Sequence, residues 1–121
     1  MDDQEIRRRV PVWTALSDLF LDTEMQDNEH QHIARVISEA GYSAAEADHI
    51  LRTEVAPVFY MNMLSVAGEW AGWSEEEVRK MVLERLSRTA WWQRIDWLRG
   101  KFHNRFMALV EGDWADVKKF L

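Results

Sequence analysis

The sequence has no cysteine, and it has only five glycines and two prolines among its 121 residues. Without cysteine the chain cannot form a disulfide, a thiolate metal site or a cysteine nucleophile. The shortage of glycine and proline, together with the lack of alternating apolar and polar runs, argues against a β-rich protein. Hydrophobic residues make up 47% of the chain, which is enough for a core and argues against intrinsic disorder.

Long apolar runs are also missing. The first residues, MDDQEIRRRVPVW, are acidic and then basic, with no apolar run behind them as in a secretory signal peptide. The longest nearly uncharged stretch, residues 55–68, is too short to span a bilayer. We therefore expect a soluble, cytoplasmic protein that does not contact a membrane.

Apolar residues instead recur at helical spacing. Ser43 with Glu46, and Ser74 with Glu77, match the capping box that begins a helix. Asp27 is a candidate N-cap, and Gly41 is a candidate residue just after a helix end. These signals predict one all-α domain over residues 1–121, with six to seven helices around a buried central helix.

The expected helices follow from these signals and from the breakers between them. Proline removes a backbone N–H, so we expect only a frayed turn before Pro11 and a bend or break at Pro57. The stretch after Pro57 is apolar all round, as in a buried helix, and is the predicted central one. The predicted helices cover residues 11–20 and about 27–40, a third opens at Ser43, and the central one runs from Val55 to near residues 68–72. A fifth opens at Ser74 with its stripe over residues 78–86, a sixth covers roughly 90–110, and Asp113 is a candidate cap for a last short turn over 114–120.

The charges are unevenly distributed along the chain, whose formal net charge is −6. Residues 18–54 hold nine acids against two bases, whereas residues 79–105 hold eight bases against two acids. A surface dense in one sign of charge speeds association with the opposite sign. An acidic region with no catalytic motif near it favours a basic protein partner, although a solubility coat fits the same charge count. The predicted rim contacts are Asp22, Glu24, Asp27, Glu29, Asp48 and Glu54.

Two Glu-x-x-His strings offer a different function. Glu29 with His32, and Glu46 with His49, each place a carboxylate and an imidazole on one helical face. Paired strings of this kind build di-iron sites in four-helix bundles. Here the strings are only 17 residues apart and lie among polar residues, so the preferred interpretation assigns no metal and no other cofactor.

A third function rests on tryptophan, of which the chain has seven. Trp97 shares a predicted helical side with Arg94, Lys101 and Arg105, and an aromatic and basic stripe of this kind binds single-stranded nucleic acid. The net negative charge and the ordinary covering of tryptophan by arginine stems make this the weakest of the three interpretations.

Two strings, PVWTALSDLFLDTE at residues 11–24 and EVAPVFYMNMLSVAGEWAGW at residues 54–73, resemble an uncharacterised family of short bacterial proteins. This resemblance implies a bacterial, cytoplasmic origin and supplies no catalytic residue. In size, acidity and helical content the chain is also similar to immunity proteins that neutralise toxins. We therefore expect a non-enzymatic binding protein that occludes a basic partner, with a toxin as one candidate.

Two further expectations concern single positions. Glu69 lies between small and aromatic residues at the end of the most apolar stretch, so we expect it to be buried and paired with Arg85 or Arg88. The oligomeric state is open, because only exposure of Trp92, Met107 and Val110 on the sixth predicted helix would indicate a homodimer.

Overall fold

Up to residue 87, the regular structure of the described residues consists of seven short elements. A computed structural model describes residues 1–21, 24–64, 71–87, 107–108 and 110–121. Its elements are α1 (Asp3–Ser17), a 3₁₀ turn (Asp18–Phe20), α2 (Asp27–Glu39), α3 (Ala44–Ile50), a π-helical turn (Leu51–Val55), α4 (Ala56–Leu64) and α5 (Glu75–Ser87). Residues 110–118 are helical as well. The all-α prediction is confirmed for the described residues, which contain no strand.

The number of helices and two of their boundaries differ from the prediction. Five α-helices with defined bounds lie in the described part of the chain, against the six to seven predicted, and residues 110–118 are a further helical stretch. The chain is helical through Gly112 and Asp113, where the sequence predicts a helix end. A single glycine costs only about 1 kcal/mol relative to alanine, so it weakens a helix without stopping it.

Helix α1 also runs through a predicted breaker. It begins after Asp2, whose side chain accepts a hydrogen bond from the Glu5 N–H at 2.8 Å, and it continues past Pro11. The expected frayed turn is therefore wrong. Proline deprives the Arg7 carbonyl of its helical partner. Arg7 is exposed, so water can take that place.

The signals at the other helix starts and ends are mostly confirmed. Both capping boxes form, with the Ser43 and Ser74 hydroxyls each accepting a backbone N–H at 3.1 Å. Gly41 follows α2 with φ of +82°, as predicted. The N-cap of α2 is Gln26 rather than Asp27, because the Glu29 carboxylate reaches back to the Gln26 N–H at 2.9 Å.

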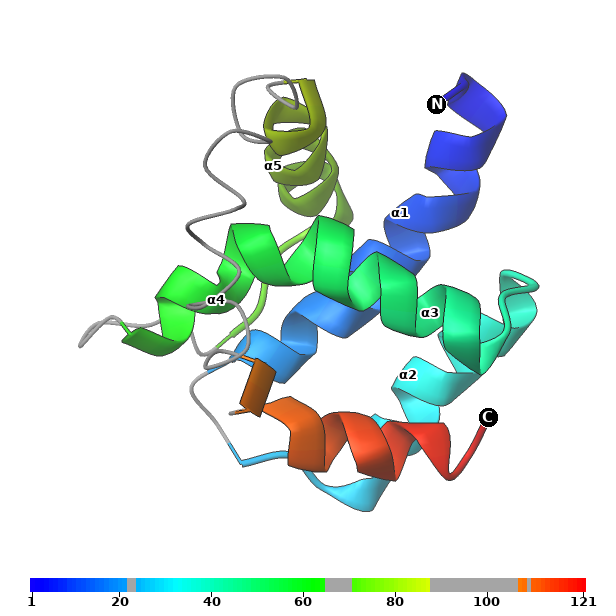
Figure 1. Cartoon of the computed structure of the whole chain (residues 1–121), viewed down its shortest axis with the longest axis vertical. Helices are drawn as coiled ribbons and strands as arrows, with labels where there is room; N and C mark the ends of the chain where they lie inside the picture. Colours follow the sequence, from blue (N-terminus) through cyan, green and yellow to red (C-terminus); the bar gives the residue numbers. More distant parts are fainter. Residues whose placement is uncertain (22–23, 65–70, 88–106, 109) are drawn as a thin grey trace.

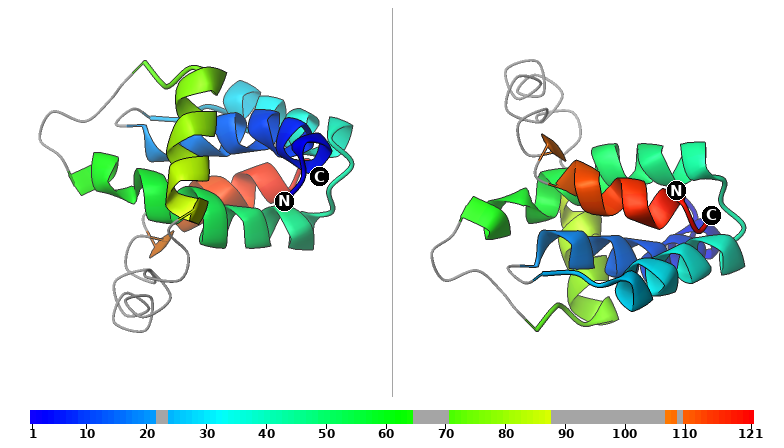
Figure 2. Two further views of the ribbon diagram at one scale, coloured as in Figure 1. Left: turned by 90° about the horizontal axis from the view of Figure 1, so that it is seen from above. Right: turned by 90° about the horizontal axis from the view of Figure 1, so that it is seen from below.

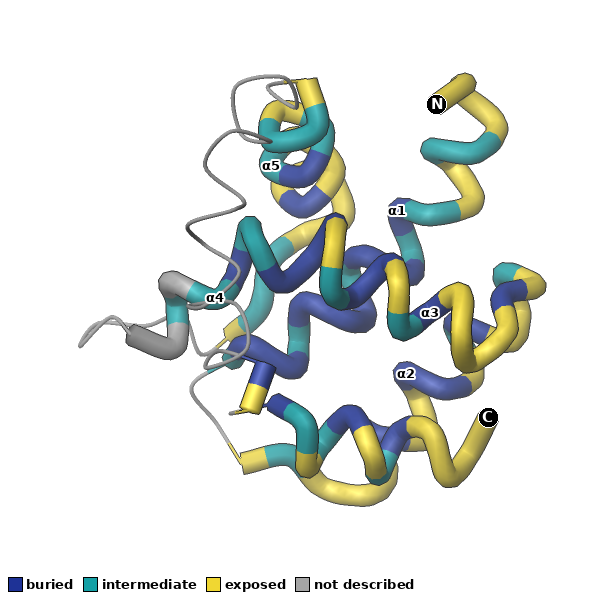
Figure 3. The backbone as a smooth tube through the Cα atoms, viewed as in Figure 1, coloured by how far each residue is buried: buried dark blue, intermediate teal, exposed yellow. Residues whose placement is uncertain are grey.

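Among the described residues, the second half of α1 is deeply buried, whereas much of the predicted central helix, which ends near residues 68–72, lies outside them. Helix α1 packs against α2, α5 and the π-helical turn, and Trp13 and Leu16 are fully buried. In α4, Ala56 and Phe59 are buried, whereas Val58 is only half-buried. Figure 1 shows α3 and α4 crossing α1, with α5 toward one end and the helix of residues 110–118 at the other. Figure 3 shows buried positions lining the surfaces where these helices meet.

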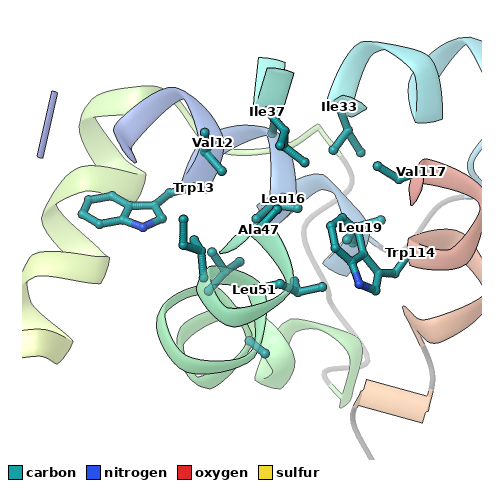
Figure 4. Close-up of a cluster of buried hydrophobic side chains, with 14 of the residues drawn as sticks. Val12, Trp13, Leu16, Leu19, Ile33, Ile37, Ala47, Leu51, Trp114 and Val117 are labelled. Atoms are coloured by element: carbon teal, nitrogen blue, oxygen red, sulfur yellow. The ribbon is translucent and has the colours of Figure 1, made fainter. Parts of the chain in front are cut away.

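The last helix, residues 110–118, packs between the first two helices and the segment of α3 and α4. Seen from below, it lies between the α1–α2 pair and the α3–α4 path (Figure 2). Trp114 and Val117 are fully buried and insert beside Leu19 and Ile33 (Figure 4). The end of the chain is thereby held against the start of α2 and against α3.

Candidate functional site

Three of the six predicted rim acids are exposed around the start of α2. Glu24 precedes the helix, and Asp27 and Glu29 lie in its first turn. The Asp27 side chain is 81% exposed. The carboxylate of Glu29 is partly used in the cap of α2. These three carboxylates are therefore at the surface, and their role as partner contacts stays a prediction.

The last helix brings further carboxylates to the same place. Asp113 and Asp116 face His30 of α2 and are only partly buried. We call Glu24, Asp27, Glu29, Asp113 and Asp116 together the α2-start acidic surface. Lys119 offsets part of its charge through an ion pair with Asp116 at 3.0 Å.

Asp18 lies at the end of α1, and charged side chains of α2 influence the pKa of its carboxyl group. Burial raises the pKa of Asp18, the charge of His32 opposes the rise, and the charge of Glu29 adds to it. The end of α1 and the start of α2 therefore share one electrostatic environment.

Asp48 is a structural acid rather than an open contact. Its carboxylate accepts hydrogen bonds from Arg52 Nε at 2.9 Å and from Trp114 Nε1 at 2.8 Å. Burial alone would raise the pKa of Asp48, but these two hydrogen bonds lower it. Arg52 continues to Glu111 at 2.7 Å, so this group ties α3 to the last helix.

Glu54 is buried, which corrects its placement among the surface acids. Only 5% of the residue is exposed. One carboxylate oxygen accepts the Trp13 indole N–H at 2.9 Å, and the other accepts a hydrogen bond from Arg9. Charge counting along the sequence cannot separate such an acid from a solvated one, because its partners lie 41 and 45 residues away.

Several predicted positions fall outside the described residues. They are Asp22, Glu69 and its proposed partner Arg88, Trp92, and the stripe of Arg94, Trp97, Lys101 and Arg105. Met107 and Val110 are described and are buried at 1% and 0% exposure. These two residues therefore do not form the exposed apolar face that would indicate a homodimer.

The two Glu-x-x-His strings are not brought into one ligand set. Glu29 and Glu46 cap the starts of α2 and α3, which occupies their carboxylates. Glu46 and His49 line an open pocket of about 330 Å³ with Arg9 and Tyr42, and neither Glu29 nor His32 lines it. Among the described residues, the group of potential metal ligands that does form is a different one, made of His30, Asp113 and Asp116.

His30 is the residue that the sequence analysis missed. It is 3% exposed, with Nδ1 3.3 Å from Asp27 Oδ1 and Nε2 3.0 Å from Asp113 Oδ1. Burial on its own lowers the pKa of His30, but the hydrogen bonds to Asp113 and Asp27 outweigh it and raise the pKa. The imidazole is therefore buried among the carboxylates of Asp27, Asp113 and Asp116.

A signal for His30 was present in the sequence. His30 precedes Ile33 by three residues and Ile37 by seven, which extends the apolar stripe of α2 by one turn. A polar residue on such a stripe is buried and needs partners. The Glu-x-x-His pattern instead pointed to Glu29 and His32, and His32 is exposed.

Comparison with known proteins gives a family and no function. Residues 7–120 match the model of a domain of unknown function, DUF7079, and the chain belongs to that family. Searches of curated proteins and of solved structures returned no match. In the described part of the chain, no helix has the length and apolar character needed to cross a bilayer.

Proposed function

We propose that this protein is a non-enzymatic protein-binding module that holds a basic protein partner against the α2-start acidic surface. The observation that carries the proposal is the gathering of the Asp27, Asp113 and Asp116 carboxylates around His30, from two segments far apart in the sequence. Glu24 and Glu29 are exposed within three residues of Asp27. Acids in the first turn stabilise a helix through its dipole, and this effect explains the presence of Asp27 and Glu29 without any binding partner. That effect does not account for Glu24 before the helix or for Asp116 in the last one.

The packing beneath the surface suits it to binding. His30 links α2 to the last helix, and Trp114 and Val117 anchor that helix in the core. A rigid support reduces the entropy lost on association. Exposed carboxylates at the rim steer a basic partner and set its orientation, which mainly raises the association rate.

In its finer form, the proposal takes the partner to be a protein toxin that this chain neutralises by occlusion. A small acidic helical domain with no assigned catalytic group suits that task, since covering a basic active surface requires no chemistry from the inhibitor. The finer form predicts a cognate toxin gene beside the gene for this protein.

The test is co-purification with the products of neighbouring genes. We expect one basic product to bind more tightly than about 10 μM. The double variant Glu24→Lys, Asp27→Lys should weaken it at least about tenfold, through a slower association rate whose salt dependence is lost.

A matched control is available on α5. Glu75 is the first residue of α5, as Asp27 is of α2, and Figure 1 shows α5 far from the start of α2. Glu75→Lys with Glu76→Lys makes the same change in net charge and should leave binding intact. Equal weakening by both double variants would mean that only net charge matters, and would contradict a defined surface.

A further inference from the structure

We infer that His30, Asp113 and Asp116 form a binding site for a divalent first-row transition-metal ion such as zinc. The site differs from both Glu-x-x-His strings. Its two aspartates also belong to the α2-start acidic surface, but metal binding does not depend on whether a basic protein binds there. It joins a histidine of α2 to two aspartates of the last helix, 83 and 86 residues further along the chain.

The spacing of the ligand atoms fits one ion after small side-chain rotations. One nitrogen of His30 and one oxygen from each aspartate all lie within 4.8 Å of one another. Two ligands of one tetrahedral zinc ion, each at about 2.1 Å, lie about 3.4 Å apart, so the ligand atoms must approach one another by on the order of 1 Å. Asp113 and Asp116 are three residues apart on one helix, so both carboxylates already face the same side.

The orientation of the imidazole is that of a metal ligand. A histidine that binds a metal through one ring nitrogen almost always donates the other N–H to a carboxylate or carbonyl. Here Nδ1 lies 3.3 Å from Asp27 Oδ1, and Nε2 is directed at Asp113 Oδ1, 3.0 Å away. Asp27 therefore helps to hold the ring with Nε2 directed at Asp113, and an oxygen of Asp116 lies within 4.8 Å.

Charge and burial favour a cation at this point. Three carboxylates, those of Asp27, Asp113 and Asp116, surround one imidazole that is 97% buried. A divalent ion would take the place of the hydrogen between Nε2 and Asp113, and binding would release a proton when the imidazole starts charged. Lys119 must leave Asp116, which is easy because the lysine side chain is 72% exposed.

The ligand types limit the kind of ion. One imidazole nitrogen and two carboxylate oxygens suit zinc, manganese, iron or cobalt, whereas calcium and magnesium prefer oxygen alone. Three protein ligands leave one tetrahedral position for water.

The test uses the full chain, stripped of metal and titrated with Zn²⁺ by calorimetry and with Co²⁺ by visible absorption. We expect one equivalent of either ion to bind, with the absorption of a tetrahedral or five-coordinate Co²⁺ site. A 100-fold excess of Zn²⁺ over its dissociation constant should raise the Tm by about 10 °C.

Variants identify the ligands. Asp116→Asn should weaken Zn²⁺ binding at least tenfold and spare the fold, because Asp116 is partly exposed and bonds Lys119 rather than His30. Glu111→Gln, on the same helix with the same change in charge, should bind as the parent does. The double variant His32→Gln, His49→Gln should also bind normally, which excludes the Glu-x-x-His strings.

Two results would overturn the inference. One is binding of less than about 0.2 equivalents of Zn²⁺ under these conditions, since a true site of this kind fills nearly stoichiometrically. The other is equal affinity in Asp116→Asn and the parent. Both readouts use the metal alone, so they are independent of whether a basic protein binds.

Discussion

The buried carboxylate of Glu54 gives the sharpest stability prediction. It accepts hydrogen bonds from Trp13 and Arg9 at once, one on each oxygen. Glu54→Gln preserves the volume but replaces one acceptor by an NH₂ group. That group must face either the indole N–H or the guanidinium, so one buried donor loses its partner.

The expected cost follows from the two losses together. An unsatisfied buried donor costs about 1–3 kcal/mol, and breaking a buried ion pair costs about 3–5 kcal/mol. Arg9 keeps Glu5 as a second carboxylate partner at 2.8 Å, which places the result near the lower end. We expect Glu54→Gln to lower the free energy of unfolding by about 2–3 kcal/mol.

Urea unfolding followed by far-ultraviolet circular dichroism measures this loss, with the m-value checked for two-state behaviour. Glu5→Gln is the control, because Glu5 bonds the same arginine from a more exposed position. It should cost clearly less than Glu54→Gln, since solvent screens an exposed pair. A change below about 0.5 kcal/mol for Glu54→Gln, or equal costs for both variants, would refute the reasoning.

Two further predictions concern the glycines and pH. Gly41→Ala should destabilise the fold by about 1–2 kcal/mol, because φ is +82° at this position. Gly112→Ala lies in a helix with open space around the new Cβ and should stabilise the fold by about 0.5–1 kcal/mol. Urea unfolding midpoints that move in the same direction for both variants would contradict this pair of predictions. Asp48 has a lowered folded-state pKa, so its ionised form stabilises the fold above the unfolded pKa of about 3.8, and that contribution is lost as pH falls through the folded pKa. The stability lost in Asp48→Asn should therefore be larger at pH 7 than at pH 2, and a gap that stays constant with pH would refute the assignment.

The parts of the fold that depend on neighbouring residues could be predicted from the sequence. Both capping boxes and the positive φ of Gly41 are set by contacts within a few residues. The failures are positions where packing outweighs a local preference. Helix α1 continues past Pro11 because Val12, Trp13 and Leu16 are buried on its inner face, and that gain exceeds the cost of one missing helical hydrogen bond, about 3 kcal/mol.

The candidate site shows the same division between local and distant information. In the sequence Asp27, Asp48 and Glu54 are three equivalent acids of one acidic stretch, and only distant partners separate them. Trp13 holds Glu54 from 41 residues away, and Trp114 holds Asp48 from 66.

An acid count over a window sums charges without knowing which are already neutralised, so it overstates the charge offered to a partner. A better signal was the phase of the helix. His30 falls on the buried stripe of α2, and a buried imidazole requires hydrogen-bond partners, which Asp27 and Asp113 supply. The phase of the helix predicts that such partners exist, but only the fold shows that one of them is a carboxylate 83 residues away.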